Sequence, residues 1–183
     1  FSRKLAFLKE AHAVALFPGG FGTLDEAMET LTLVQTGKNP PIPLIFIEDD
    51  DNGYWESVLL FMKNTLLTKG LISGQDFSLF SITRDIDEAV RIIDDFYSVY
   101  HSIRFSGKTL IVRLNKPLTA AQVQTLEEEF RDIIIPGGHL RMDKALPIES
   151  DEPDLADLPR LIFDFDRRYY GLLHAFIRRL NTF

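Results

Sequence analysis

The stretch from Leu16 to Glu26, LFPGGFGTLDE, brings three glycines together with a threonine and two carboxylates. Glycine adopts positive φ readily and lets the backbone approach a ligand closely. A helix that begins here offers unbonded N–H groups and the positive end of its dipole to an anion. The pattern therefore indicates an anion-binding turn that needs no lysine.

A purely structural interpretation of the same residues is also open. Thr23-Leu24-Asp25-Glu26 matches a capping box, in which Thr23 is the N-cap and Glu26 reaches back from the N3 position. The spacing alone is as consistent with a capping Glu26 as with a catalytic one. A second Pro-Gly-Gly, at 136–138, follows a predicted helix and leads into a strand, so we expect its glycines to end that helix and form a turn.

Strands and helices alternate over the first hundred residues. Apolar runs predict strands at 13–17, 43–47 and 77–82, and helical spacing predicts helices at 22–36, 54–67 and 86–97. This alternation favours a parallel sheet with helices on its faces, so we predict an α/β, Rossmann-like fold. Open sheets of this kind bind ligands at the carboxyl ends of their strands, and the glycine run directly follows the first one.

The regular alternation of strands and helices ends after His101. A strand at 108–114, a helix at 119–134 with Thr119 as N-cap, two strands at 139–146 and 160–166, and an amphipathic final helix are predicted. This β-α-β-β-α order predicts a small α+β domain. We place the two domains at residues 1–102 and 103–183.

Composition excludes several classes of function. The net charge of −7 is carried entirely by residues 1–102, and so acidic a surface does not suit nucleic-acid binding. With no cysteine, disulfides and thiolate catalysis are excluded, and a cytoplasmic location is expected. No apolar run reaches the roughly 18–20 residues that span a bilayer. The four histidines show no metal-binding spacing, and Glu48–Asn52, EDDDN, lacks the spacing of a calcium loop, so we predict no metal and a solvated loop.

Arg3-Lys4 and the run PGGFGTLDE at Pro18–Glu26 resemble the paired R-K and P-G-G-x-G-T-x-x-E motifs of the Lonely Guy (LOG) family. Its members are cytokinin-activating phosphoribohydrolases and related bacterial nucleotide nucleosidases, often labelled lysine decarboxylases. The similarity covers roughly residues 1–97. It implies hydrolysis of the N-glycosidic bond of a nucleoside 5′-monophosphate to free base and ribose 5-phosphate, without a cofactor. No lysine has a recognisable Schiff-base setting, so the decarboxylase label is rejected.

The resemblance also implies roles for individual residues. It assigns catalysis to Arg3 and Glu26 and phosphate binding to Gly19, Gly20, Gly22 and Thr23. Lys4 is a candidate substrate contact or the partner of a nearby acid, and Tyr54 either lines the site or packs in the core or an interface. Tyr54 lies in a Gly-aromatic stretch that matches the family after the same strand. A homodimer is the expected assembly, since family members commonly dimerise.

The chain opens directly on the Arg-Lys pair. We therefore expect the first strand and first glycine-rich loop of the family's nucleotide-binding domain to lie upstream of Phe1. Two alternatives to the hydrolase stay open. One is a non-catalytic carrier of a nucleotide or molybdenum cofactor with the same fold, and the other is a regulatory subunit.

Overall fold

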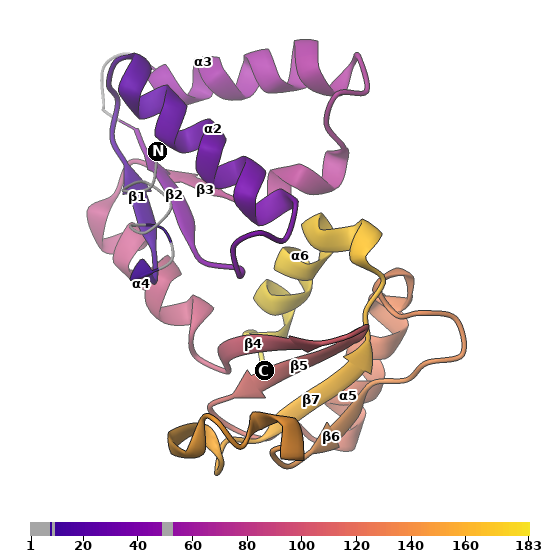
Figure 1. Ribbon diagram of the computed structural model, residues 1–183. Coiled ribbons are helices and arrows are strands. Elements are labelled where there is room, and N and C mark those ends of the chain that lie inside the picture. The colour runs from indigo at the N-terminus through magenta and orange to yellow at the C-terminus, as the bar shows by residue number, and fades with distance from the viewer. Residues whose placement is uncertain (1–7, 9, 49–52) are drawn as a thin grey trace. The chain divides into compact units, whose positions relative to one another are not determined.

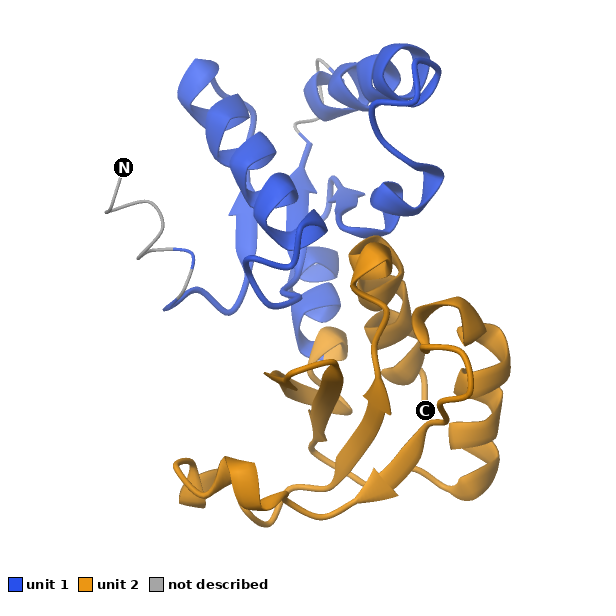
Figure 2. Cartoon of the chain, turned by 45° about the vertical axis from the view of Figure 1, so that its right-hand side comes forward, with its two compact units in different colours: residues 1–94 blue, residues 95–183 orange. Residues whose placement is uncertain are grey.

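The computed structural model describes residues 8, 10–48 and 53–183. The chain divides into two compact units, Phe1–Asp94 and Asp95–Phe183 (Figures 1 and 2). The boundary predicted near residue 102 falls inside strand β4, Tyr100–Ser106, which belongs to the second unit. Across the described ranges, no helix is both long and apolar enough to cross a membrane.

The first unit is an α/β layer structure, as predicted. Its elements are β1 Val14–Leu16, α2 Phe21–Gln35, β2 Leu44–Ile47, α3 Tyr54–Phe61, a π-helix Met62–Leu67, a 3₁₀ helix Gly74–Ser78, β3 Ser81–Thr83 and α4 Ile86–Phe96. The strands are parallel in the order β1-β2-β3 (Figure 1). The strand predicted at 77–82 is displaced, because Phe77 in the 3₁₀ helix and Phe80 after it pack into the core before β3 begins.

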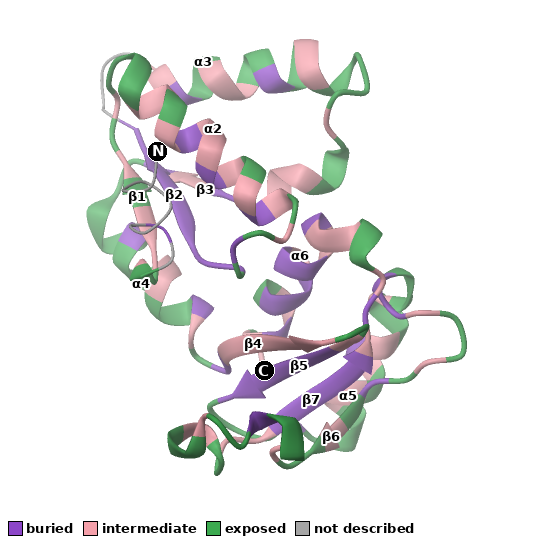
Figure 3. Cartoon of the chain, in the orientation of Figure 1, coloured by how far each residue is buried: buried purple, intermediate pink, exposed green. Residues whose placement is uncertain are grey.

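Alternate residues of β2 face opposite layers of helices, as a strand requires. Leu44 and Phe46 pack in a cluster with α2 and α3, whereas Ile45 and Ile47 pack against α4. All four residues are buried, which explains why this strand is an uninterrupted apolar run (Figure 3). The parallel arrangement brings the carboxyl ends of the strands to one edge of the sheet, where the glycine run begins.

The second unit contains one strand more than the sequence predicted. Its elements are β4 Tyr100–Ser106, β5 Thr109–Leu114, α5 Ala120–Glu129, β6 Arg141–Asp143, β7 Arg160–Asp164 and α6 Tyr170–Leu180, with short 3₁₀ turns between them. The sheet is antiparallel in the order β4-β5-β7-β6. The order is therefore β-β-α-β-β-α, and the predicted β-α-β-β-α lacked β4. A register shift between Tyr100 and Ser102 interrupts the alternation that would have revealed this strand.

Both helices of the second unit cover the same face of the sheet. Leu110 and Val112 of β5 share one buried cluster with Leu126 of α5 and Phe176 of α6. The start of α5 is as predicted, because Thr119 forms a capping box: its hydroxyl accepts from the N–H of Gln122, and its own N–H donates to the Gln122 side chain.

The other face of that sheet carries buried charge. Arg113 and Arg160 are paired across β5 and β7, and both donate to the buried carboxylate of Glu149, with Nε–O distances of 2.9 and 3.1 Å. Burial alone would raise the pKa of Glu149, but the N–H of Leu146 and the two guanidinium groups lower it. Arg113 also donates to Glu152 and thereby lowers the pKa of that carboxyl group. These ion pairs hold the acidic loop between β6 and β7 against the sheet.

Candidate functional site

Helix α2 begins at the glycine run. Gly20 is its N-cap, and the Gly20 carbonyl accepts from the N–H groups of Thr23 and Leu24 at 3.1 and 3.2 Å. Thr23 therefore lies inside the first turn, and no side chain among the described residues caps the helix. The alternative interpretation, a capping box of Thr23 and Glu26, is wrong, because the helix starts three residues earlier than that box requires. This leaves the first N–H groups of α2 to a partner other than a side-chain cap.

The three glycines of the run differ in how much space surrounds their Cα atoms. A Cβ on Gly19 would lie 2.2 Å from Oγ1 of Thr23, so a larger residue there requires the Thr23 side chain or the loop to shift. A Cβ on Gly20 or Gly22 would meet nothing within 4 Å. None of the three has positive φ, contrary to expectation; the positive-φ glycines among the described residues are Gly37, Gly53, Gly70, Gly107 and Gly137. Packing against the described residues thus does not explain Gly20 or Gly22, and no described atom fills the space beside them.

The second Pro-Gly-Gly shows the opposite behaviour. Gly137 has φ +84°, and the N–H of Gly138 donates to the carbonyl of Ile135 at 2.8 Å, which matches a type II turn with Pro136 at its second position. A Cβ on Gly138 would lie 3.0 Å from that same carbonyl oxygen. This copy is a turn, as predicted, but it does not end α5, which stops earlier at Glu129.

Tyr54, the first residue of α3, reaches back to the glycine run. Its hydroxyl donates to the carbonyl of Gly19 at 2.8 Å. Its ring lies edge-on to Trp55, with centroids 4.9 Å apart, and Trp55 in turn stacks on Phe46 of β2 at 4.3 Å. The loops that follow β1 and β2 are therefore joined at the carboxyl edge of the sheet.

Glu48 holds the start of α3, a role that the sequence did not reveal. Its carboxylate is buried and accepts from the N–H groups of Tyr54 at 2.9 Å and Glu56 at 3.0 Å. Its own N–H donates to Thr83 at the end of β3. The prediction of a solvated EDDDN loop is wrong for Glu48, because a carboxylate at a helix start satisfies N–H groups there. Residues 49–52 lie outside the described residues.

Glu26 lies one helical turn beyond Gly22. Residues four apart share a face of a helix, and helical side chains lean toward its N-terminus. The half-buried Glu26 therefore shares a face of α2 with Gly22. Phe21, between the two open glycines, is 93% exposed and adds an apolar surface at the same place. The arrangement can present backbone N–H groups and a carboxylate to one anionic, partly apolar molecule.

A family model described as "possible lysine decarboxylase" matches residues 1–93, just over half of the chain. The chain belongs to this family, also called the LOG family. Cytokinin riboside 5′-monophosphate phosphoribohydrolase LOG7 of Arabidopsis thaliana is 28% identical over 102 residues, 55% of this chain and 45% of the relative. LOG1 of the same plant is 30% identical over 95 residues, 51% of this chain and 42% of LOG1.

A probable LOG enzyme from Oryza sativa subsp. japonica, LOGL3, is 33% identical over 106 residues, 57% of this chain and 47% of the relative. The chain thus spans about half the length of the curated relatives it matches. Arg3 and Lys4, the other motif pair of the LOG family, lie outside the described residues. The structure brings Gly19, Gly20, Gly22, Thr23, Glu26 and Tyr54 to the carboxyl edge of the LOG-family sheet.

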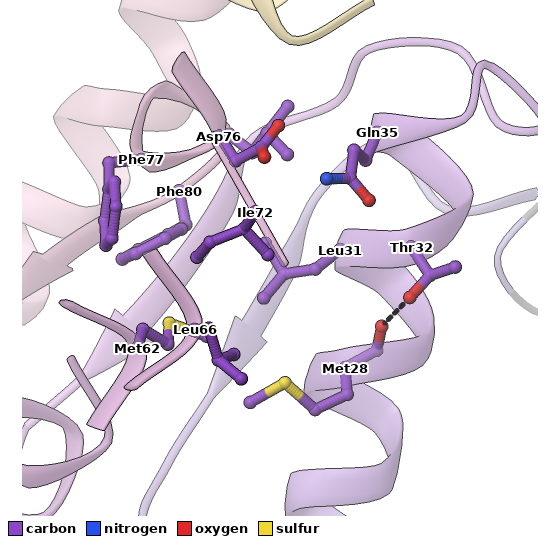
Figure 4. Close-up of a pocket in the computed structure, with 11 residues that line it drawn as sticks. Met28, Leu31, Thr32, Gln35, Met62, Leu66, Ile72, Asp76, Phe77 and Phe80 are labelled. Atoms are coloured by element: carbon purple, nitrogen blue, oxygen red, sulfur yellow. Dashed lines mark hydrogen bonds between the residues drawn. The ribbon is translucent and has the colours of Figure 1, made fainter. Parts of the chain in front are cut away.

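A cavity of about 180 Å³ lies elsewhere in the LOG-family unit (Figure 4). It is lined by the second half of α2 and by residues from Met62 to Phe80, and most of the lining is apolar. Gln35, the last residue of α2, turns its amide toward this cavity. Asp76 is the charged residue of its lining. The cavity therefore has no feature that attracts a phosphate, and it lies at the opposite end of α2 from the glycine run.

No group of three or more acidic, histidine or cysteine side chains that could hold a metal ion occurs in the part of the chain that the structure describes. The candidate site offers backbone amides, the Glu26 carboxylate and aromatic side chains as far as the described residues go.

Proposed function

We propose that this LOG-family chain takes part in hydrolysing the N-glycosidic bond of a nucleoside 5′-monophosphate to free base and ribose 5-phosphate. The observation that carries the proposal is the placement of Glu26 one turn beyond Gly22, beside the open glycine start of α2. The names of the plant relatives, which describe phosphoribohydrolases of cytokinin riboside 5′-monophosphate, support the reaction class.

The 5′-phosphate is assigned to the start of α2. The N–H groups of Gly20, Phe21 and Gly22 precede the first bonds within the helix, which begin with Thr23. Aligned peptide dipoles make this end of a helix favourable for an anion. The absence of Cβ atoms on Gly20 and Gly22 lets a phosphate approach the backbone. The acidic character of residues 1–102 makes such a local, lysine-free site the appropriate one.

Glu26 is assigned the reacting centre. When the C1′–N bond breaks, its electron pair leaves with the base, which takes up a proton, and C1′ develops oxocarbenium character. A carboxylate close to C1′ stabilises that charge and can orient and deprotonate the water whose oxygen bonds to C1′. Arg3, by its resemblance to the family, is proposed as the partner of Glu26, and Lys4 as a substrate contact.

The test uses the full-length protein and a panel of nucleoside 5′-monophosphates with adenine, prenylated adenine, guanine and pyrimidine bases. Chromatography measures release of free base and ribose 5-phosphate. Glu26→Gln keeps the size of the side chain and removes its charge, and we expect turnover to fall at least ~100-fold because general base catalysis typically contributes that much. Asp25→Asn, the same charge change at the neighbouring exposed residue, is the matched control and keeps turnover.

Wild-type hydrolysis by both Glu26→Gln and Asp25→Asn would refute the role of Glu26. Nucleotide binding by the wild-type protein without release of any base would favour the non-catalytic carrier instead. The homodimer and the cytoplasmic location stay predictions; light scattering of the purified protein tests the first, and cell fractionation tests the second.

A further inference from the structure

The hydrogen bond between Tyr54 and Gly19 joins two loops that are 35 residues apart in the chain. The donor is the hydroxyl group of the first residue of α3, and the acceptor is the carbonyl of the residue that precedes the N-cap of α2. The phenol has no other hydrogen bond among the described contacts, so this single bond accounts for the polar end of the side chain.

The direction of the Gly19 carbonyl decides the direction of the next N–H group. A trans peptide is planar, and its C=O and N–H point in opposite directions. When Tyr54 holds the carbonyl of Gly19, the N–H of Gly20 is turned away from Tyr54. The Gly19–Gly20 peptide has no Cβ on either side, so sterics restrict its rotation less than that of any other kind of peptide. An external bond is therefore needed to keep it in one orientation.

The donor is itself held firmly. Glu48 is buried and accepts from the N–H groups of Tyr54 and Glu56, which fixes the first turn of α3. The ring of Tyr54 lies at 87° to that of the fully buried Trp55. Tyr54 is thus fixed by its contacts with Glu48 and Trp55, and its hydrogen bond restricts the otherwise freely rotating Gly19–Gly20 peptide.

We propose that Tyr54 is a positioning residue, which orients the Gly19–Gly20 peptide so that the N–H of Gly20 faces the phosphate of the substrate. The inference rests on the proposed function for the identity of the ligand. It assigns Tyr54 to recognition of the phosphate monoester through Gly19 and Gly20, and not to contact with the base or the ribose.

Tyr54→Phe removes the hydroxyl and retains the ring that packs on Trp55. We expect the inhibition constant of inorganic phosphate and the KM of the best nucleoside monophosphate each to rise about 10-fold, the factor that 1.4 kcal/mol represents. Binding of the corresponding nucleoside, which has no phosphate, is expected to stay within twofold. Thr32→Ala is the matched control, because it removes another hydroxyl-to-carbonyl bond, to Met28 at 2.7 Å, from α2. It leaves both phosphate constants unchanged.

A second measurement separates this inference from the proposed function. The amide resonance of Gly20, observed by NMR in the ligand-free protein, is expected to shift or broaden in Tyr54→Phe and to stay in place in Thr32→Ala. An unchanged Gly20 resonance, or an unchanged phosphate constant in Tyr54→Phe, overturns the positioning role. A changed resonance in a protein whose wild type binds neither phosphate nor nucleotide overturns the proposed function, and with it the assignment to phosphate.

Discussion

Gly22→Ala should raise the stability of the first unit and lower the proposed hydrolase activity. Gly22 is the second residue of α2, its φ is not positive, and a new Cβ would meet no atom within 4 Å. Alanine therefore fits without strain, and it reduces the conformational freedom of the unfolded chain. We expect the free energy of unfolding to rise by about 0.4–1 kcal/mol.

The expected loss of activity comes from the same open space. If the substrate phosphate approaches the N–H of Gly22, the added methyl group crowds it. Loss of one hydrogen bond to a charged group costs about 1.5–3 kcal/mol. This predicts a fall in kcat/KM of roughly 10- to 150-fold.

Trp55 makes the stability measurement specific to the first unit. It is the single tryptophan of the chain and is fully buried, so its emission reports unfolding of this unit during a guanidinium titration. Base release from the nucleoside monophosphate gives kcat/KM in parallel. A Gly22→Ala protein that is more stable and fully active would show that no ligand needs the open space. A less stable one would contradict the described start of α2.

Gly19→Ala is the matched contrast to Gly22→Ala. Its Cβ would lie 2.2 Å from Oγ1 and 3.0 Å from Cβ of Thr23, so the loop or the Thr23 side chain must move. Overpacking of this kind costs about 1–3 kcal/mol. Adding Thr23→Ala removes the closer contact and should recover part of the loss, which a double-mutant cycle measures.

Two predictions concern the second unit. Glu149→Ala leaves the buried Arg113 and Arg160 without their shared carboxylate and should lower the free energy of unfolding by about 3–5 kcal/mol in a chemical denaturation followed by circular dichroism, whereas Asp154→Ala in the same loop should change it by less than about 0.5 kcal/mol. Because the folded-state pKa values of Glu149 and Glu152 are lowered, their contribution is complete above the unfolded value of about 4.3 and disappears as pH falls through the folded values. Ellipticity recorded between pH 6 and 2 should therefore show an acid transition that Glu149→Gln makes shallower, and an identical profile for both proteins would contradict this reasoning.

Sequence patterns predicted those elements whose local conformational preference agrees with their packing in the fold. The apolar run of β2 is buried on both faces, so its sequence could hardly belong to another element. The hairpin of β4 and β5 was missed because its bulge breaks the alternation near Ser102. A signal was nevertheless present: Gly107, with φ +59°, begins a two-residue turn between paired Ser106 and Thr109, where a hairpin favours glycine.

The candidate site was predicted in part, for the same physical reason. Most residues of the candidate site belong to one motif, Gly19 to Glu26, and they lie close together because they are neighbours in sequence. The helix start was placed too late because Gly20 caps α2 with backbone alone, and the capping preferences of side chains give no sign of that. Glu48 could not be found, since a buried carboxylate that binds two N–H groups of α3 looks the same in sequence as the acidic residues next to it.

The two Pro-Gly-Gly sequences separate the glycines that a fold needs from those that it does not. Gly137 and Gly138 are accounted for by positive φ and by the carbonyl of Ile135, so a purely structural role is sufficient for them. Gly20 and Gly22 have neither constraint, and alanine at position 22 would favour the helix. Among the described residues nothing accounts for these two glycines, and the proposed phosphate site offers an explanation for them. The start of α2, rather than the apolar cavity at its other end, is therefore where a ligand should be sought.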